Sequence, residues 1–179
     1  MPRLAIYIFI FLLLTSCINK DFYSSYGMKV DSLSASLEEM AAKYESLDTI
    51  RIMAQYDTIR MQLDSLSKTP EITLDTLVVF YKYIGKDYKT FWRGHPLTIR
   101  ELKYTRAQLT DLKHDIEKYQ LDEEGVARYF IQEKESVRKL NDRMDYNMVL
   151  IKKNMRQFSE TEPKIAQLID SLYQVPASE

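Results

Sequence analysis

Apolar side chains recur at alternating spacings of three and four residues along most of the chain after residue 30. Leu33, Leu37, Met40, Tyr44 and Leu47 follow this spacing. Such spacing places one apolar stripe along an α-helix, and a repeat of seven residues is typical of helices that pack lengthwise against one another. The pattern predicts an all-α fold: an elongated bundle of antiparallel, coiled-coil-like helices.

Local start and stop signals divide this pattern into five helices. Pro70 ends the first helix, Gly94 and Pro96 stop the second, and Thr161 with Pro163 opens the fifth. Every proline after residue 16 and three of the four glycines fall at a proposed boundary, and this agreement supports the helical interpretation. The predicted helices cover residues 31–67, 70–92, 98–120, 123–158 and 162–174.

Two points along the pattern leave its continuity open. The heptad phase slips near Ile50, which we expect to change the winding of the first helix locally. Between the third and fourth helices the phase runs straight through, so one very long helix is an alternative. We prefer a turn at residues 121–125, because three acidic residues and Gly125 interrupt the stripe there. Polar residues at heptad positions of the fourth helix, where they can fix the register, are Glu133, Asn147 and Asn154.

Charge is distributed unevenly among the predicted helices. Residues 31–66 hold three basic and seven acidic side chains, whereas residues 126–158 hold eight basic and four acidic ones. Opposite surface charge can select which helices pair and in which orientation, although each pair contributes little energy. We therefore expect the first and fourth helices to pack along each other, with the second and third as a hairpin beside them.

The overall composition limits the classes of function. The 179 residues are enough for one domain, and 25 basic against 26 acidic side chains argue against a nucleic-acid-binding protein. A single cysteine excludes an internal disulfide and a cysteine-rich zinc site, and two histidines leave little for a histidine-based metal centre. We expect no metal and no other cofactor.

The first 16 residues have the features of a secretory signal peptide. Arg3 precedes an apolar run of eleven residues, Leu4 to Leu14, which is about half of the roughly 20 residues that a membrane-spanning helix needs. The run leads into Leu14-Thr15-Ser16-Cys17. This tetrapeptide resembles the lipobox of bacterial lipoproteins: an aliphatic residue, two small residues and a cysteine.

The resemblance implies how the chain is processed and where it resides. In bacterial lipoproteins the cysteine receives a diacylglycerol and the signal peptide is cut just before it, so Cys17 becomes the lipidated first residue. We then expect a lipidated tether over residues 17–30, one helical bundle domain over 31–175 and a frayed tail over 176–179. Ile18, in place of an aspartate, favours the outer membrane, and Asp21 leaves open whether the protein faces the periplasm or the cell surface.

The motifs of common enzyme classes are missing from the sequence. It has no glycine-rich phosphate loop, no G-x-S-x-G elbow and no H-E-x-x-H motif. Asp111, His114 and Asp115 lie close together on one predicted helix, but one such cluster falls short of the several ligand-bearing helices of a di-iron bundle. We expect a protein that is not an enzyme.

Aromatic residues are the best candidates for a contact surface. Phe91, Trp92 and Arg93 stand together at the predicted end of the second helix, and tryptophan and arginine are enriched where proteins bind partners. The alternative is that Phe91 belongs to the core and Trp92 covers the end of the bundle. Tyr23 and Tyr26 fall in the predicted tether, where no core requires them.

These features predict a lipid-anchored cell-envelope protein with a non-enzymatic structural, scaffold or adaptor role. Its partners would be the membrane, through lipidated Cys17, and an envelope protein or a second copy of the chain, with no nucleic acid. The alternative is an envelope ligand-binding or inhibitory module that uses Phe91, Trp92 and Arg93.

Overall fold

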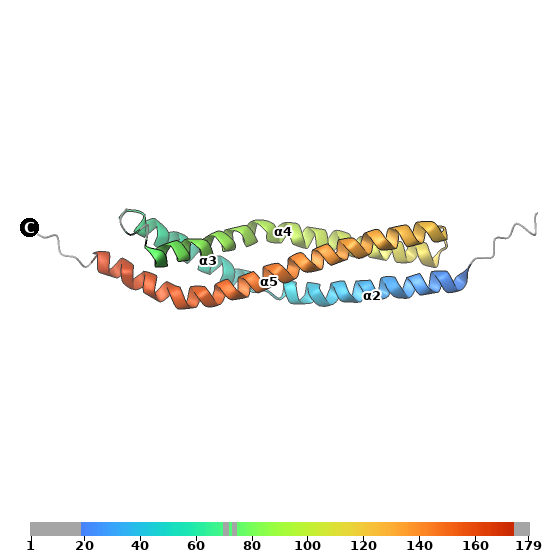
Figure 1. Cartoon of the computed structure of the whole chain (residues 1–179), viewed down its shortest axis with the longest axis horizontal. Coiled ribbons are helices and arrows are strands. Elements are labelled where there is room, and N and C mark those ends of the chain that lie inside the picture. The colour runs from blue at the N-terminus through green and yellow to red at the C-terminus, as the bar shows by residue number, and fades with distance from the viewer. Residues whose placement is uncertain (1–18, 70–71, 73–74, 174–179) are drawn as a thin grey trace, which may run out of the picture.

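A computed structural model describes residues 19–69, 72 and 75–173, so Cys17 and the tail 176–179 lie outside the described part of the chain. Four helices make up almost all of it, and the described residues form no strand, which confirms the predicted all-α bundle. In Figure 1, α4 and α5 run along the molecule, while α2 and α3 follow each other beside them. The helices are α2 Lys20–Glu45, α3 Thr49–Leu66, α4 Thr76–Glu117 and α5 Glu123–Tyr173.

One unbroken heptad stripe holds each long helix in the bundle. The stripe of α5 runs from Val126 to Leu172, and that of α4 from Tyr81 to Ile116, with all its positions buried or half-buried. At 1.5 Å per residue, the 51 residues of α5 extend about 77 Å, so the core is a long narrow seam. The α4 positions are Tyr81, Ile84, Tyr88, Phe91, His95, Thr98, Leu102, Thr105, Leu109, Leu112 and Ile116.

The predicted tether is corrected, because α2 begins at Lys20. Asn19 caps the helix by accepting a hydrogen bond from the backbone of Phe22 at 3.2 Å. The Tyr23 hydroxyl donates to the Leu121 carbonyl at 2.8 Å, and the Tyr26 ring packs edge-on against Phe130 at 5.4 Å. The two tyrosines thus continue the heptad stripe toward the N-terminus and fasten the start of α2 to the α4–α5 turn.

The predicted first helix is broken where the heptad phase slips. The chain leaves the helical conformation at residues 46–48, and Asp48 caps α3 by accepting a hydrogen bond from the Arg51 backbone at 2.9 Å. Buried residues stand at positions 37 and 44 before the break and at 52 and 59 after it, one residue out of phase. A continuous helix would turn the second set away from the core by about 100°. The break realigns both sets.

Two predicted boundaries are wrong, because α4 and α5 continue through their prolines. Pro96 lies inside α4 and Pro163 inside α5, so the second and third predicted helices form one helix, as do the fourth and fifth. A proline in a helix removes one backbone hydrogen bond, at a cost of about 3 kcal/mol. The heptad stripe stays in phase across both prolines, however, so that ending the helix would unseat buried side chains such as Phe91 and Thr98.

The turn between α4 and α5 exists although the heptad phase passes straight through it. Tyr119 adopts a positive φ of 54°, the backbone of Gln120 donates to the Asp115 carbonyl at 2.9 Å, and that of Tyr119 donates to Ile116 at 3.2 Å. This is the hydrogen-bonding pattern that ends a helix with a left-handed residue, usually glycine. Asp122 then accepts a hydrogen bond from the Gly125 backbone at 2.8 Å. The third and fourth predicted helices are therefore separate, but the turn lies at residues 118–122 and not at the predicted 121–125, because α5 begins at Glu123.

One buried and one half-buried polar pair set the register between α3 and α4. The Tyr81 hydroxyl donates to Gln62 Oε1 and the Tyr88 hydroxyl to Gln55 Oε1, both at 2.6 Å. Each pair is seven residues from the next on both helices, as antiparallel heptad packing requires. Of the polar heptad residues predicted on α5, Asn154 is buried and donates to Asp87 of α4 at 3.1 Å. A shift along the helices would leave these groups without partners.

The expected neighbours of the acidic first helix are partly confirmed. Both α2 and α3 contact α5, but the predicted charge pairing between them is wrong. The acidic residues of α2 meet cations of α4 instead: Arg106 binds Glu38 at 2.6 Å, and Lys113 binds Asp31 at 2.5 Å. Arg143 of α5 also pairs with α4. Exposed pairs of this kind stabilise a protein by less than about 1 kcal/mol each.

Two glycines of α4 provide a matched test of the close approach between α3 and α4. An added Cβ at Gly85 would lie 2.8 Å from Cγ2 of buried Ile59, whereas at Gly94 it would meet nothing within 4 Å. We expect Gly85→Ala to lower the free energy of unfolding by about 1–3 kcal/mol. Gly94→Ala should raise it by roughly 0.5–1 kcal/mol through helix propensity. Urea unfolding measures both, and equal effects would contradict the described packing.

The register pairs lead to a second prediction. Tyr88→Phe leaves the buried Gln55 oxygen without its donor, and we expect a loss of about 1–3 kcal/mol in the free energy of unfolding. Tyr83→Phe is the control, because Tyr83 is exposed on the same helix and should change stability by less than about 0.5 kcal/mol. Thermal or urea unfolding of both variants measures the two changes in the free energy of unfolding. Equal stabilities would show that the buried pair does not fix the register.

Candidate functional site

The three aromatic and basic residues predicted as a contact patch lie in the middle of α4 and point in different directions. Phe91 is only 4% exposed, and its ring packs 6.4 Å from that of Tyr44 in the core. Trp92 is 40% exposed and Arg93 is exposed. Phe91 therefore cannot take part in one surface patch with the other two, and Trp92 lies along the side of the bundle, not at its end. Cys17 lies outside the described residues.

Around Trp92 and Arg93, the solvent-facing side of α4 carries a row of cations that we call the cationic strip. Lys86, Arg93 and Arg100 repeat every seven residues on one line of the helix, directly opposite its buried stripe. The strip extends over about 32 Å at 1.5 Å per residue. Its exposed members are Lys82, Lys86, Lys89, Arg93, Arg100 and Lys103.

No acidic side chain interrupts the strip. Between Thr76 and Gln108, α4 contains two carboxylates, Asp87 and Glu101. Both are engaged by α5, Asp87 with Asn154 and Glu101 with Arg143. Their charges lie on the seam between the two helices, while the strip keeps a single sign of charge.

Apolar and aromatic side chains border the strip on both sides. Leu97 is 53% and Tyr104 65% exposed, and they stand seven residues apart on the side nearer α5. Trp92 lies on the other side, in the row that also contains Gly85 and Arg106, which face α3 and α2. The α4 surface therefore combines cations with exposed rings, and the helix is convex there.

The sequence pointed to Trp92 and Arg93 as binding residues, which stays a prediction, but the strip around them was missed. Dividing α4 at residues 93–96 separated the lysines at 82, 86 and 89 from the cations at 100 and 103. The signal that could have found it is the heptad phase, which continues without a slip from Tyr88 through His95 to Leu102. The surface rows of a helix follow from its buried row.

A buried polar cluster lies beneath the same part of α4. The Nδ1 atom of His95 is 3.2 Å from the Tyr44 hydroxyl, and the two rings are 5.2 Å apart. Burial lowers the pKa of His95 and raises the pKa of Tyr44, and Thr98 and Asn147 beside the Tyr44 hydroxyl offset part of the latter shift. The cluster favours a neutral imidazole inside the bundle.

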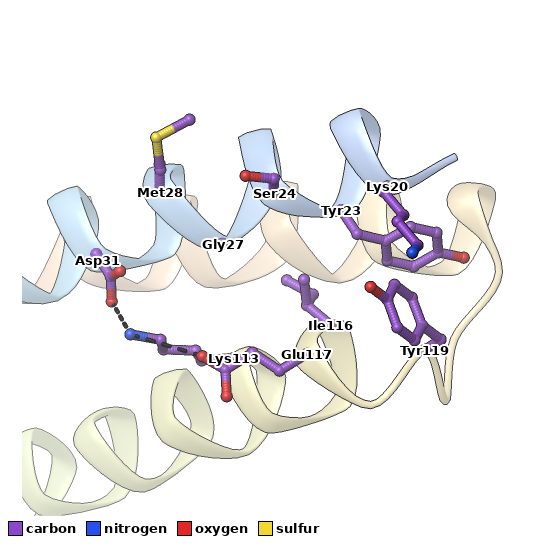
Figure 2. A pocket seen from close by; sticks show the side chains of 10 residues that line it. All are labelled: Lys20, Tyr23, Ser24, Gly27, Met28, Asp31, Lys113, Ile116, Glu117 and Tyr119. Carbon is purple, nitrogen blue, oxygen red and sulfur yellow. Dashed lines mark hydrogen bonds and ion pairs between the residues drawn. The ribbon is translucent and has the colours of Figure 1, made fainter. Parts of the chain in front are cut away.

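An open cavity of about 420 Å³ lies between the first turns of α2 and the last turns of α4. Figure 2 shows the rings of Tyr23 and Tyr119 side by side at one end and the Lys113–Asp31 ion pair at the other. An added Cβ at Gly27 would meet nothing within 4 Å, so the backbone of α2 is open to the cavity. Lys113 is already paired with Asp31, and we assign no ligand to the cavity.

Among the described residues, no three His, Cys, Asp or Glu side chains come together in a way that could hold a metal ion. His114 is exposed on α4, with Asp111 one turn before it. In the same part of the chain, no helix has both the length and the apolar character needed to cross a bilayer.

Comparison with known protein families, with curated proteins and with solved structures gives no match to this chain.

Half-buried His95 leads to a prediction about pH. Because the pKa of His95 in the folded state lies below its ordinary value of 6.5, its contribution to stability is complete above pH 6.5 and is lost as the pH falls. We expect the free energy of unfolding to decrease between pH 7.5 and pH 5.5, above the range where most carboxylates titrate. His95→Gln should remove most of this dependence, and exposed His114→Gln should keep it. Urea unfolding at several pH values tests this, and identical pH profiles for the two variants would contradict it.

Proposed function

We propose that the protein is a lipid-anchored protein of the bacterial cell envelope, whose helical bundle acts as a non-enzymatic scaffold or adaptor. The observation that carries the proposal is the short distance between the lipobox cysteine and the bundle. Cys17 is two residues before Asn19, which caps α2, and two residues extend about 7 Å at most. A lipid on Cys17 would thus hold the bundle directly at the membrane surface.

The first turns of α2 are firmly joined to the rest of the bundle, which supports a rigid attachment. Tyr23 bonds the Leu121 carbonyl and packs edge-on against Tyr119 at 5.0 Å. The α4–α5 turn would therefore lie next to the anchor. The C-terminal end of α5 would lie at the opposite end of the rod, far from the anchor. Ile18 after the lipobox cysteine favours the outer membrane.

A scaffold or adaptor role is supported by the kind of surface that the bundle presents. Its exposed aromatic residues stand on the convex sides of helices, such as Tyr104 on α4 and Tyr146 on α5. Tyrosine side chains are enriched where proteins contact partners, and a convex helix surface contacts a large partner over many residues. The second candidate is a ligand-binding or inhibitory module, and exposed Trp92 next to Arg93 is the observation that favours it.

The anchor is tested by replacing the chain's single cysteine. In the bacterial host, Cys17→Ala should abolish incorporation of labelled fatty acid and leave the signal peptide uncleaved. Thr15→Ala is the matched control, because it keeps a small residue at its lipobox position and should leave lipidation intact. Mass spectrometry of the N-terminal peptide measures both. If the wild-type protein is processed but its Cys17 carries no lipid, the proposed anchor is contradicted.

The adaptor role has a separate test in cells. A photo-crosslinking residue at Tyr146 or at exposed Met61 of α3 should capture one envelope protein in stoichiometric amount. Recovery of the chain alone would favour self-association. Turnover of a substrate that depends on specific side chains would overturn the non-enzymatic proposal.

A further inference from the structure

We propose that the cationic strip of α4 docks on anionic phospholipid headgroups, so that the rod lies along the membrane with α4 toward the bilayer. The proposal deepens the proposed function, because the anchor at Cys17 would keep the strip close to the membrane. The affinity of the strip for headgroups does not itself require the acyl chains attached to Cys17. Charge, shape and bordering side chains each support it.

The charge of the strip is concentrated along one line of α4, and the three cations on that line are not neutralised by a neighbouring carboxylate among the described residues. Within the described chain, Lys86, Arg93 and Arg100 have no carboxylate partner, and the two acidic residues of this part of α4 are held by α5. Each lysine or arginine close to an anionic membrane contributes about 1 kcal/mol, or about fivefold in affinity. Several cations in one row can therefore produce substantial binding.

The distribution of charge around the rod gives it one preferred side. Residues 20–66, which form α2 and α3, carry eight acidic and five basic side chains. An anionic surface would repel that side and attract α4. The rod would therefore turn α4 toward the bilayer.

The shape of the strip fits a flat surface better than a small ligand. Its cations follow one convex helix over about 32 Å, with no concave wall to enclose a molecule. Trp92, Leu97 and Tyr104 border the cations, and aromatic and aliphatic side chains next to lysine and arginine are typical of helices that lie at a membrane interface.

Trp92 provides a direct readout, because it is the chain's single tryptophan and borders the strip. We would record its fluorescence in the mature lipidated chain reconstituted in phosphatidylglycerol–phosphatidylethanolamine vesicles or in phosphatidylcholine vesicles. In the anionic vesicles the emission should shift to shorter wavelength and become protected from iodide. It should return toward the phosphatidylcholine value in about 1 M salt, where screening reduces the Debye length to about 3 Å.

A lipid-free arm separates the strip from the anchor. The mature chain with Cys17→Ser should still sediment with the anionic vesicles and not with the zwitterionic ones. Neutralising Lys86, Arg93 and Arg100 to glutamine should weaken this binding by roughly 100-fold. The matched control neutralises Arg138, Lys152 and Arg156, three exposed cations that heptad spacing places on the side of α5 turned away from α4, and it should keep most of the affinity. Circular dichroism verifies that both triple variants fold.

The possible failures are distinguishable. Binding that is equal for the two triple variants, or equal on both kinds of vesicle, would overturn the strip as a membrane-docking surface, even if Cys17 is lipidated. Binding of an acidic polypeptide such as polyglutamate without binding of vesicles would also overturn it and indicate a protein partner. Retention of strip-dependent vesicle binding in a chain that is never lipidated in cells would overturn only the anchor.

Discussion

The structure depends on one constraint: each long helix must keep a single row of side chains facing a core that is only a few residues wide. Because this core is narrow, a helix whose heptad phase slips turns its apolar side chains away from the core and exposes them to solvent. The tyrosine–glutamine pairs between α3 and α4 add a second condition, because their polar groups are satisfied in one register only. Together, hydrophobic phase and buried hydrogen bonds specify both which faces meet and how the helices are aligned.

The same constraint shapes the surface. Because α4 passes through Pro96 without losing phase, its buried row and its exposed rows continue from one half of the helix to the other. The exposed rows carry cations from Lys82 to Lys103, and the two carboxylates in this region are drawn to the α5 seam. A surface of one charge sign thus follows from the unbroken heptad phase of α4.

The sequence allowed the helical class, the elongated bundle and most of the core to be predicted, and it failed mainly at boundaries. Proline and glycine at 94–96 suggested a stop, although the core positions on both sides were in phase. Tyr23 and Tyr26 continued the heptad but were assigned to a tether because Ser and Gly neighbours obscured the pattern. Conversely, a turn ends α4 at Tyr119, which carries the positive φ where glycine is usual. Of the cationic strip, only Arg93 was among the residues predicted to bind a partner, because a helix end was placed in the middle of the strip.

What the sequence by itself determined is the period of burial: heptad spacing specifies helices, their buried rows and the phase slip near Ile50. That the chain leaves the helix at this slip and forms α2 and α3 was decided by the tertiary structure. The tertiary structure decided where the chain reverses and which breaks are tolerated. Phase alone cannot place a reversal, since a stripe that passes through a turn and one that continues along a helix look the same. Burial of the apolar stripe decides where the chain reverses. The stripe that runs from α4 into α5 is removed from solvent only when the two helices fold back against each other. For the same reason, α4 and α5 each contain a proline. Ending the helix at the proline would expose apolar side chains, and the free-energy cost of that exposure exceeds the cost of one lost backbone hydrogen bond.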